Sequence, residues 1–348
     1  MSSCGGRSRS ARCRYCSSSI TVAPDACAVQ CSQCNGVTRI RRSSSLVIRP
    51  PQRPVGFPCH RGNKRAVLIG ITYAGMRRGC GQLNGPLNDV KCMRQLLCQR
   101  FGFPNECILV LTDDQKDPCR LPTKDNIRMA MHWLVQGCSS GDSLVFHFSG
   151  MGAQVCDENG DELDGFDEAI CPMDSFQKGP ILDDEINDAI VRPLVPGVKL
   201  HAIVDACHSA GVLDLSFLCR VCSTGNWQWE DHRPRNGQCK GTSGGQAMLI
   251  SGFSGGKTQF SVAADSYASV GAMTHSFVKA VQCETHGVTY GRVLTTMRNI
   301  MVNGGNTCNM PGPCGGAPIS KIANFSGVQE PQLSSSEMFD IHRRAFAL

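Results

Sequence analysis

The stretch Lys199-Leu-His-Ala-Ile-Val-Asp205-Ala-Cys207-His208-Ser-Ala-Gly211 decides the fold of this chain. Its apolar, β-branched run before Asp205 predicts a buried strand of a parallel sheet. Ligands of open α/β sheets bind beyond the carboxyl ends of the strands, so Cys207 follows a strand where chemistry usually takes place. The alternative is a structural cysteine, one of 22 in the chain. The flanking Asp205 and Gly211 favour a nucleophile.

Around this stretch, strand-like and helix-like segments alternate from residue 63 onward. The apolar patterns predict strands at residues 65–73, 107–112, 143–149, 200–205 and 247–252. They predict helices at residues 87–101, 123–135, 183–191, 272–282 and 291–302, with Thr123 as a helix cap. Such alternation is typical of an α/β fold, with a mostly parallel sheet flanked by helices.

Composition sets limits on the class of protein. The chain has 348 residues, of which 41% are hydrophobic and 18% charged, and it contains neither 18 continuous apolar residues nor the apolar region of a secretory signal. We therefore expect no membrane partner, a cytoplasmic or nuclear location, and cysteines that are thiols or metal ligands.

Charge is distributed unevenly along the chain. Residues 1–65 carry a net charge of about +11 and the remainder about −5, within a total of +6. A basic arm suits an acidic partner or is simply solvated. Few aromatic residues are interleaved with its arginines, so we do not expect a nucleic-acid partner.

Four cysteines near the N-terminus have the spacing of a metal site. Cys13 and Cys16 form one Cys-x-x-Cys pair, and Cys31 and Cys34 form a second after fourteen intervening residues. Two such pairs supply four thiolates in the tetrahedral arrangement that Zn²⁺ prefers. So short a segment has no core of its own, and we expect zinc to stabilise its fold.

A second strand end carries a similar concentration of functional groups. It reads Phe146-His147-Phe148-Ser149-Gly150-Met151-Gly152, and Met151 lies 56 residues before Cys207. A His-to-Cys separation of about 50 residues is typical of caspases. The two strand ends therefore suggest a cysteine peptidase.

From Lys64 onward the chain resembles type I plant metacaspases, which are caspase-like cysteine peptidases. The resemblance lies in RAVLIGITY (65–73), LNDVKCMRQLL (87–97), LTDDQKDPCRLPTKDNI (111–127), GDSLVFHFSG (141–150), GDELDGFDEAICP (160–172), DDEI (183–186), DACHSAG (205–211) and TYGRVLTTMR (289–298). The cysteine-rich segment resembles the zinc finger of the plant lesion-simulating-disease family. That finger mainly contacts regulatory proteins.

The resemblance implies a division of the chain into five parts. These are a zinc finger at 1–41, a Pro/Ser/Arg-rich linker at 42–62, a large catalytic portion at 63–222, a cleavable linker at 223–245 and a small portion at 246–348. Family members are often cut after Arg or Lys behind the large portion. Candidate cleavage positions are Arg220, Arg233, Arg235 and Lys240.

Met151 is the main departure from the family. The family pattern His-x-Ser-Gly-His-Gly places the general-base histidine where this chain has Met151. A thioether does not take up a proton at useful pH. Loss of a positioned acid or base typically costs about 10²–10⁴ in rate. His147 or His208 is the alternative base. Family members, however, carry a histidine at both positions in addition to the one that acts as the base.

The remaining site residues follow from the resemblance. The backbone N–H groups of Gly152 and Cys207 would form the oxyanion hole, and Asp89, Ser149 and Asp205 would bind an Arg or Lys side chain of the substrate. The family's calcium site corresponds to four carboxylates, whose hard oxygens suit Ca²⁺: Asp167, Asp183, Asp184 and Asp214. The alternative is a solvated acidic loop. A further departure is residues 251–256, where the family carries a Cys-Asp-Asp-type sequence and this chain has SGFSGG.

Two hypotheses follow. The first is a calcium-dependent cysteine endopeptidase that cleaves protein or peptide substrates after Arg or Lys, impaired by Met151. The second is a pseudoprotease that retains the fold and the cleft and acts as a binding or regulatory scaffold in cell-death signalling.

Overall fold

A computed structural model describes most of the chain. The described residues are 9–12, 16, 18–22, 28–34, 37–39, 57, 62–75, 82–157, 162, 165–221, 226–233, 240–253, 261–264, 268–284, 287–303 and 330–348. The chain forms two compact units, residues 1–53 and residues 54–348. Within the described parts, no helix has the length and apolar character needed to cross a membrane.

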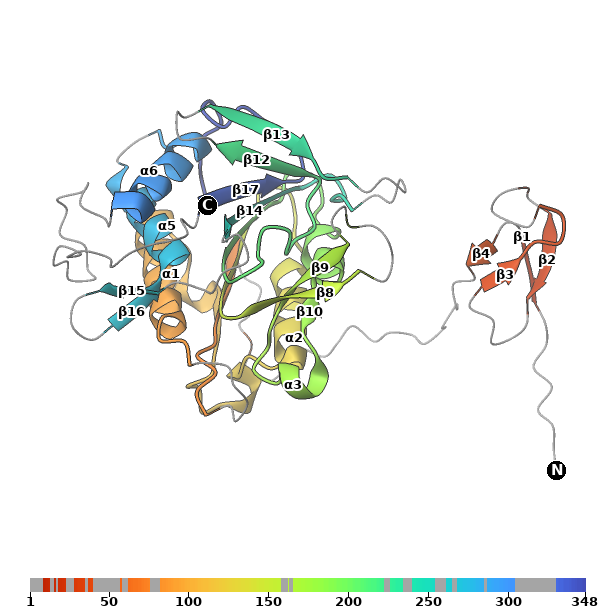
Figure 1. Ribbon diagram of the computed structural model, residues 1–348, viewed down its shortest axis with the longest axis horizontal. Helices are drawn as coiled ribbons and strands as arrows, with labels where there is room; N and C mark the ends of the chain where they lie inside the picture. Colours follow the sequence, from red (N-terminus) through yellow and green to blue (C-terminus); the bar gives the residue numbers. More distant parts are fainter. Residues whose placement is uncertain are drawn as a thin grey trace. The chain divides into compact units, whose positions relative to one another are not determined.

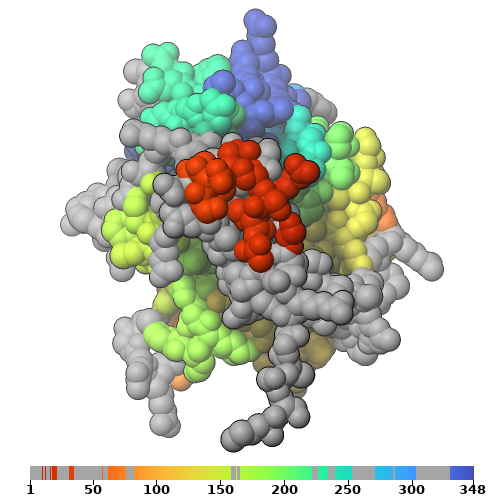
Figure 2. All heavy atoms as spheres, turned by 90° about the vertical axis from the view of Figure 1, so that its right-hand side faces the viewer, coloured from red at the N-terminus to blue at the C-terminus, as the bar shows by residue number. Residues whose placement is uncertain are grey.

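The N-terminal unit contains two short β-hairpins, which are red in Figures 1 and 2. Strands β1 (Arg9–Arg12) and β2 (Ser19–Val22) pair antiparallel, as do β3 (Ala28–Gln30) and β4 (Val37–Arg39). The cysteines Cys16, Cys31 and Cys34 lie close to the ends of these strands. Cys13 lies outside the described residues.

The larger unit is built on an eight-stranded sheet (Figure 1). Its parallel part follows the order β6 (Ile108–Thr112), β5 (Lys64–Gly70), β7 (Ser143–Ser149), β11 (Lys199–Asp205) and β14 (Gln246–Phe253). These are the five strands predicted from the apolar runs. The predicted α/β fold with a mostly parallel sheet is confirmed.

Three antiparallel strands that the sequence analysis missed extend this sheet beyond β14. They are β17 (Glu330–Ser335), β12 (Phe217–Val221) and β13 (Trp227–Asp231), the last forming the sheet edge. Buried Gln332, Ser334 and Ser335 give β17 too little apolar character to stand out in the sequence. Because β13 lies within residues 223–245, part of the predicted cleavable linker belongs to the sheet. That linker's boundaries stay a prediction.

Helices cover both faces of the sheet. Helices α1 (Pro86–Phe101), α5 (Ala272–Cys283) and α6 (Tyr290–Asn303) pack on one face together with Val145 and Ile203. Helix α2 (Lys124–Val135) packs on the other face together with Phe146 and Phe148. Successive residues of a strand point to opposite faces, so the two cores alternate along β7 and β11. The predicted Thr123 cap is confirmed: its hydroxyl accepts the N–H of Asn126 at 3.3 Å.

The helix expected at residues 183–191 is divided into two parts. Helix α4 (Asp183–Ile186) ends where η3 (Asn187–Val191), a π-helical turn, begins. Such turns are rare and often lie at functional sites. Shorter helices are α3 (Ser175–Lys178), η1 (Asn105–Cys107) and η2 (Pro118–Arg120).

Two small sheets lie beside the strand ends of the main sheet. One consists of β8 (Gly152–Cys156), β9 (Phe166–Ile170) and β10 (Ile181–Leu182), and the other of β15 (Ser261–Ala264) and β16 (Ala268–Gly271). Strand β8 follows β7 almost directly and β16 leads directly into α5. Both therefore bring backbone to the end of the sheet where Cys207 lies.

Candidate active site

The ends of β7 and β11 lie side by side and bring the two motifs together. Ser149 pairs with Asp205, and the Gly150 N–H donates to the Asp205 carbonyl at 3.2 Å. Cys207 is half-buried, two residues beyond β11. A Cβ atom on Gly152 would overlap the carbonyl oxygen of Cys207, so only glycine fits there. The structure thus joins two segments 56 residues apart, as the motifs predicted.

Hydrogen bonds to the backbone of Met151 hold it in place. Its N–H donates to the hydroxyl of Tyr73 at 2.9 Å, and that hydroxyl donates to the carbonyl of Cys171 at 2.6 Å. The Cys171 N–H donates to the Met151 carbonyl at 3.0 Å. The Met151 side chain is partly buried and packs against the core on the α2 face. The site is therefore ordered around a side chain that does not accept a proton.

The surroundings of His147 do not suit it to act as a base. Its ring is fully buried, and Nε2 lies 3.2 Å from the Thr274 hydroxyl. Burial lowers the pKa of His147 to about 3, which keeps the imidazole neutral. It lies on the α5 side of β7, whereas the side chain of Met151 packs against the α2-side core. The other candidate, His208, has a left-handed backbone with φ of 50°.

The predicted pocket residues come together around Gly271. The Ser149 hydroxyl donates to Asp89 Oδ2 at 2.6 Å, and the Gly271 N–H donates to Asp89 Oδ1 at 2.8 Å. The Thr274 N–H, in the first turn of α5, donates to Asp205 Oδ2 at 2.7 Å. A Cβ atom on Gly271 would overlap Asp205 Oδ2 and lie 2.8 Å from Asp89 Oδ2. Both carboxylates therefore converge on one point.

This convergence creates an electrostatically strained pair. Asp89, Ser149 and Asp205 are each 0% exposed. Burial and the neighbouring Asp205 raise the pKa of Asp89 well above its ordinary value of 3.8. Burial raises the pKa of Asp205 to about 6, although N–H donors at the start of α5 oppose this rise. Two buried carboxylates with raised pKa values form a natural receptor for a cation.

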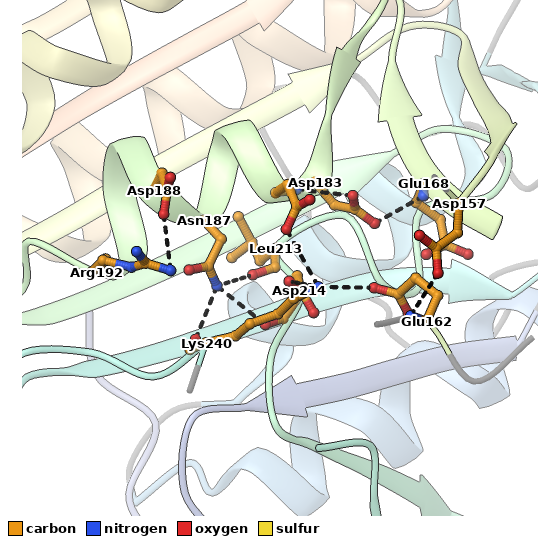
Figure 3. A network of polar contacts seen from close by, with 11 residues as sticks. Asp157, Glu162, Glu168, Asp183, Asn187, Asp188, Arg192, Leu213, Asp214 and Lys240 are labelled. Carbon is orange, nitrogen blue, oxygen red and sulfur yellow. Dashed lines mark hydrogen bonds and ion pairs between the residues drawn. The ribbon is translucent and has the colours of Figure 1, made fainter. Parts of the chain in front are cut away.

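The four predicted calcium ligands lie near β9, α4 and the loop after β11. The N–H of Glu168, which follows Asp167, donates to Asp183 Oδ2 at 2.8 Å. Burial raises the pKa of Asp183 to about 8, with contributions from Asp214 and Glu162 nearby. Burial likewise raises the pKa of Asp214 to about 7. Asp167 and Asp183 are buried, whereas Asp184 and Asp214 are half-buried. Figure 3 shows Asp183 and Asp214 close to Glu162.

A cation already occupies part of this carboxylate cluster. The ammonium of Lys240 lies 3.2 Å from Glu162 Oε1 and 3.4 Å from Asp184 Oδ1, and it pairs with Asp214 Oδ2. A buried ammonium that draws together three carboxylates marks a position suited to positive charge. The hard oxygen donors fit Ca²⁺.

The N-terminal unit brings three predicted zinc ligands together. The Sγ atoms of Cys16, Cys31 and Cys34 all lie within 4.8 Å of one another, with Cys16 and Cys31 3.6 Å apart. Thiolates bound to Zn²⁺ at about 2.3 Å in a tetrahedron are about 3.8 Å apart, which fits this triad. Hydrogen bonding between Cys16 and Ser18 is the main reason that the pKa of Cys16 is lowered, and this favours the thiolate.

Sequence reasoning missed three residues that shape these sites, Tyr73, Gly271 and Thr274, and it considered Lys240 only as a candidate cleavage position. The only local signal is at Gly271 and Thr274, where Gly-Ala-Met-Thr begins a helix whose first N–H groups attract carboxylates. Among the candidate cleavage residues, Arg220 lies in β12, Arg233 is exposed, Lys240 is buried and Arg235 lies outside the described residues.

Comparison with known proteins places this geometry in context. Residues 64–216 match the family described as "Metacaspase, peptidase C14 domain". The chain is 44% identical to metacaspase-1 of Arabidopsis thaliana, over 97% of this chain and 95% of that protein. It is 41% identical to metacaspase-3 of the same plant, over 98% of this chain and 99% of that protein. A solved structure of a Geobacter sulfurreducens protein shares the fold, with a TM-score of 0.50 and 18% identity over 82% of this chain and 97% of that one.

Proposed function

Because the chain belongs to the metacaspase family of cysteine endopeptidases, we propose that it acts on proteins at Arg or Lys residues and depends on calcium. We further propose that its turnover is impaired, since Met151 stands at the position of the general base. The single observation that carries the substrate preference is the convergence of the Asp89 and Asp205 carboxylates at Gly271.

The pocket explains a preference for a cationic side chain. Two carboxylates buried from water repel each other and bind protons at pH values where exposed carboxylates are ionised. A guanidinium donates in two directions at once and fits between them. Binding Arg or Lys would release protons from the pair and offset the cost of its burial, whereas a neutral side chain would do neither.

Cys207 is the proposed nucleophile. Its thiolate attacks the carbonyl carbon of the substrate's Arg or Lys residue, and the resulting oxyanion would accept hydrogen bonds from the N–H groups of Gly152 and Cys207. Collapse of this intermediate expels the amine of the leaving peptide, which must gain a proton. The acyl-enzyme is then released by water. Gly152 lies against the Cys207 backbone, which supports a common oxyanion site.

Met151 affects two of these steps. Its sulfur neither removes a proton from the Cys207 thiol nor supplies one to the leaving amine. A free cysteine with a pKa near 8.5 is only a few per cent thiolate at pH 7. The expected loss relative to a complete site is about 10²–10⁴ in rate.

A pseudoprotease is the second candidate, and the environment of His147 favours it. That imidazole is buried against Thr274, so it is occupied in the structure of the core rather than in proton transfer. A protein with a retained pocket and without a base would bind Arg- or Lys-containing segments and release them uncut. Its zinc finger, held by Cys13, Cys16, Cys31 and Cys34, would then contact regulatory proteins.

Cleavage of a fluorogenic peptide with Arg before the scissile bond tests both candidates. The assay compares the wild type with Met151→His and Cys207→Ala, each with Ca²⁺ and with EDTA. If calcium-dependent activity appears only in Met151→His, the pseudoprotease candidate is correct. If the wild type cleaves weakly and Met151→His raises the rate by about 10²-fold or more, the impaired protease is correct. Cleavage that survives in Cys207→Ala would contradict both.

A further inference from the structure

The ammonium of Lys240 forms an ion pair with Asp214, and the burial of this lysine is unusual. Its side chain is 4% exposed, although lysine is almost never buried unless it is paired. The residue lies within the predicted cleavable linker, residues 223–245. It enters the carboxylate cluster from a segment distant in sequence, 78 residues after Glu162.

Carboxylates surround the ammonium group of Lys240, as they would surround a bound cation. The ammonium meets one carboxylate from each of three segments: Glu162 after β8, Asp184 in α4 and Asp214 after β11. Figure 3 shows Lys240 and Glu162 converging beside Asp214. One positive charge thus faces three carboxylates, with Asp183 close by. The cluster keeps an excess of negative charge that a divalent ion would neutralise better.

The backbone around Lys240 is held by a separate contact. Asn187 is 1% exposed, and its Nδ2 lies 3.1 Å from the Lys240 carbonyl, 2.9 Å from the Leu213 carbonyl and 3.1 Å from the Asp214 carbonyl. Asn187 is the first residue of the π-helical turn. Its side chain links the backbone at Lys240 to the loop that carries Asp214. The side chain and the backbone of Lys240 therefore dock on the same loop.

We propose that Lys240 is a built-in cation that competes with Ca²⁺ for the carboxylates of Glu162, Asp184 and Asp214. The proposal rests on the calcium dependence proposed above. Calcium takes six to eight oxygen ligands at 2.3–2.6 Å, so it needs the carboxylate oxygens that Lys240 now contacts. An ammonium and a divalent ion cannot share them, because like charges a few ångströms apart repel strongly in a buried site. Calcium binding therefore displaces the Lys240 side chain.

Displacement links calcium to the accessibility of the linker. While Lys240 is buried, a protease cannot bind its side chain and cut after it. Once calcium has displaced it, Lys240 is free to enter a pocket that selects lysine. The same exchange lowers the apparent calcium affinity of the wild type, because only the fraction of molecules with Lys240 displaced can bind the ion.

Calcium titration by calorimetry tests the competition in full-length protein that also carries Cys207→Ala, which prevents self-cleavage. Lys240→Met keeps the apolar stem and removes the ammonium, and Lys91→Met on exposed α1 is the matched control. We expect Lys240→Met to bind Ca²⁺ at least about tenfold more tightly and to melt at a lower temperature in EDTA, because it leaves the carboxylates uncompensated. Lys91→Met should change neither quantity. An unchanged or weaker calcium affinity in Lys240→Met overturns the proposal.

Limited digestion with trypsin provides a second readout that leaves Lys240 itself unchanged. Calcium should accelerate cleavage after Lys240 in the Cys207→Ala protein, as identified by mass spectrometry of the fragments. Protection of Lys240 by calcium overturns the competition. Absence of calcium binding in every variant instead refutes the proposed calcium dependence, so the two failures are distinguishable.

Discussion

Replacing one carboxylate of the pocket should change the stability of the protein in a pH-dependent way. Relative to the wild type, the variant should gain more stability at neutral pH than at acidic pH. Asp205→Asn keeps the shape of the side chain and an oxygen that can accept the Thr274 N–H. It removes the charge that is buried next to Asp89. The pocket carboxylates would thus oppose folding in the absence of a bound cation.

The magnitude follows from the shift of the pKa. The pKa of Asp205 rises from 3.8 in the unfolded chain to about 6 in the native state. Between these two pH values the native state therefore keeps a proton that the unfolded chain releases. Stability from this group is complete below pH 4 and is lost as the pH rises through 6. A shift of roughly two units, at about 1.4 kcal/mol per unit, makes the loss about 3 kcal/mol. Relief of the repulsion on Asp89 adds to it with the same sign.

Urea unfolding at pH 4.5 and pH 7.5 in EDTA measures this pH-dependent contribution of Asp205 to the free energy of unfolding. The change in unfolding free energy caused by Asp205→Asn should be about 2 kcal/mol more favourable at pH 7.5 than at pH 4.5, because about 1 kcal/mol of the total is already lost at pH 4.5. Any hydrogen bond lost in the variant cancels, because it contributes at both pH values. The control is Asp125→Asn, whose exposed carboxylate has a pKa lowered by Lys178; it is ionised in both states at both pH values, so its effect should be nearly the same at each. A difference near zero for Asp205→Asn would refute the strained-pair argument.

Three further predictions concern separate parts of the chain. Cys31→Ser should reduce the zinc content of the purified protein from about one per chain to near zero, measured by atomic emission, since it removes one of three clustered thiols. Gly152→Ala introduced into Met151→His should abolish any peptidase activity that the histidine restores, because the added methyl overlaps the Cys207 carbonyl. Thr123→Ala should lower the free energy of unfolding by about 1 kcal/mol through loss of the α2 cap, with urea unfolding as the measurement.

The parallel part of the fold could be predicted because its signal is local. Strands buried on both faces read as largely apolar runs, and β5, β7 and β11 each contain such a run. The helices between them carry apolar residues at helical spacing, as in α1 and α2. The antiparallel strand β17 carries buried serines instead, and its pairing partners lie far away in sequence. No local pattern identifies such a strand.

The candidate active site was foreseen to a different degree in each part. Cys207 and Ser149 stand at strand ends, so the rule for parallel sheets places them at one edge. Asp89 reads as an ordinary residue in the first turn of a helix, and only the family resemblance pointed to a pocket. Its convergence with Asp205 depends on Gly271, which comes from a segment 182 residues away from Asp89.

The sequence by itself determined the α/β architecture and the metacaspase family. It also predicted that Met151 replaces the general base and that the N-terminal cysteines bind a metal. Only the tertiary structure decided that the pocket carboxylates share one buried point and that Lys240 fills the carboxylate cluster. A lysine among glycines and serines reads as a solvated residue of a loop. Its burial follows from ion pairs with segments that are distant in sequence. Folding brings three carboxylates together, their charges need a cation, and Lys240 contacts all three.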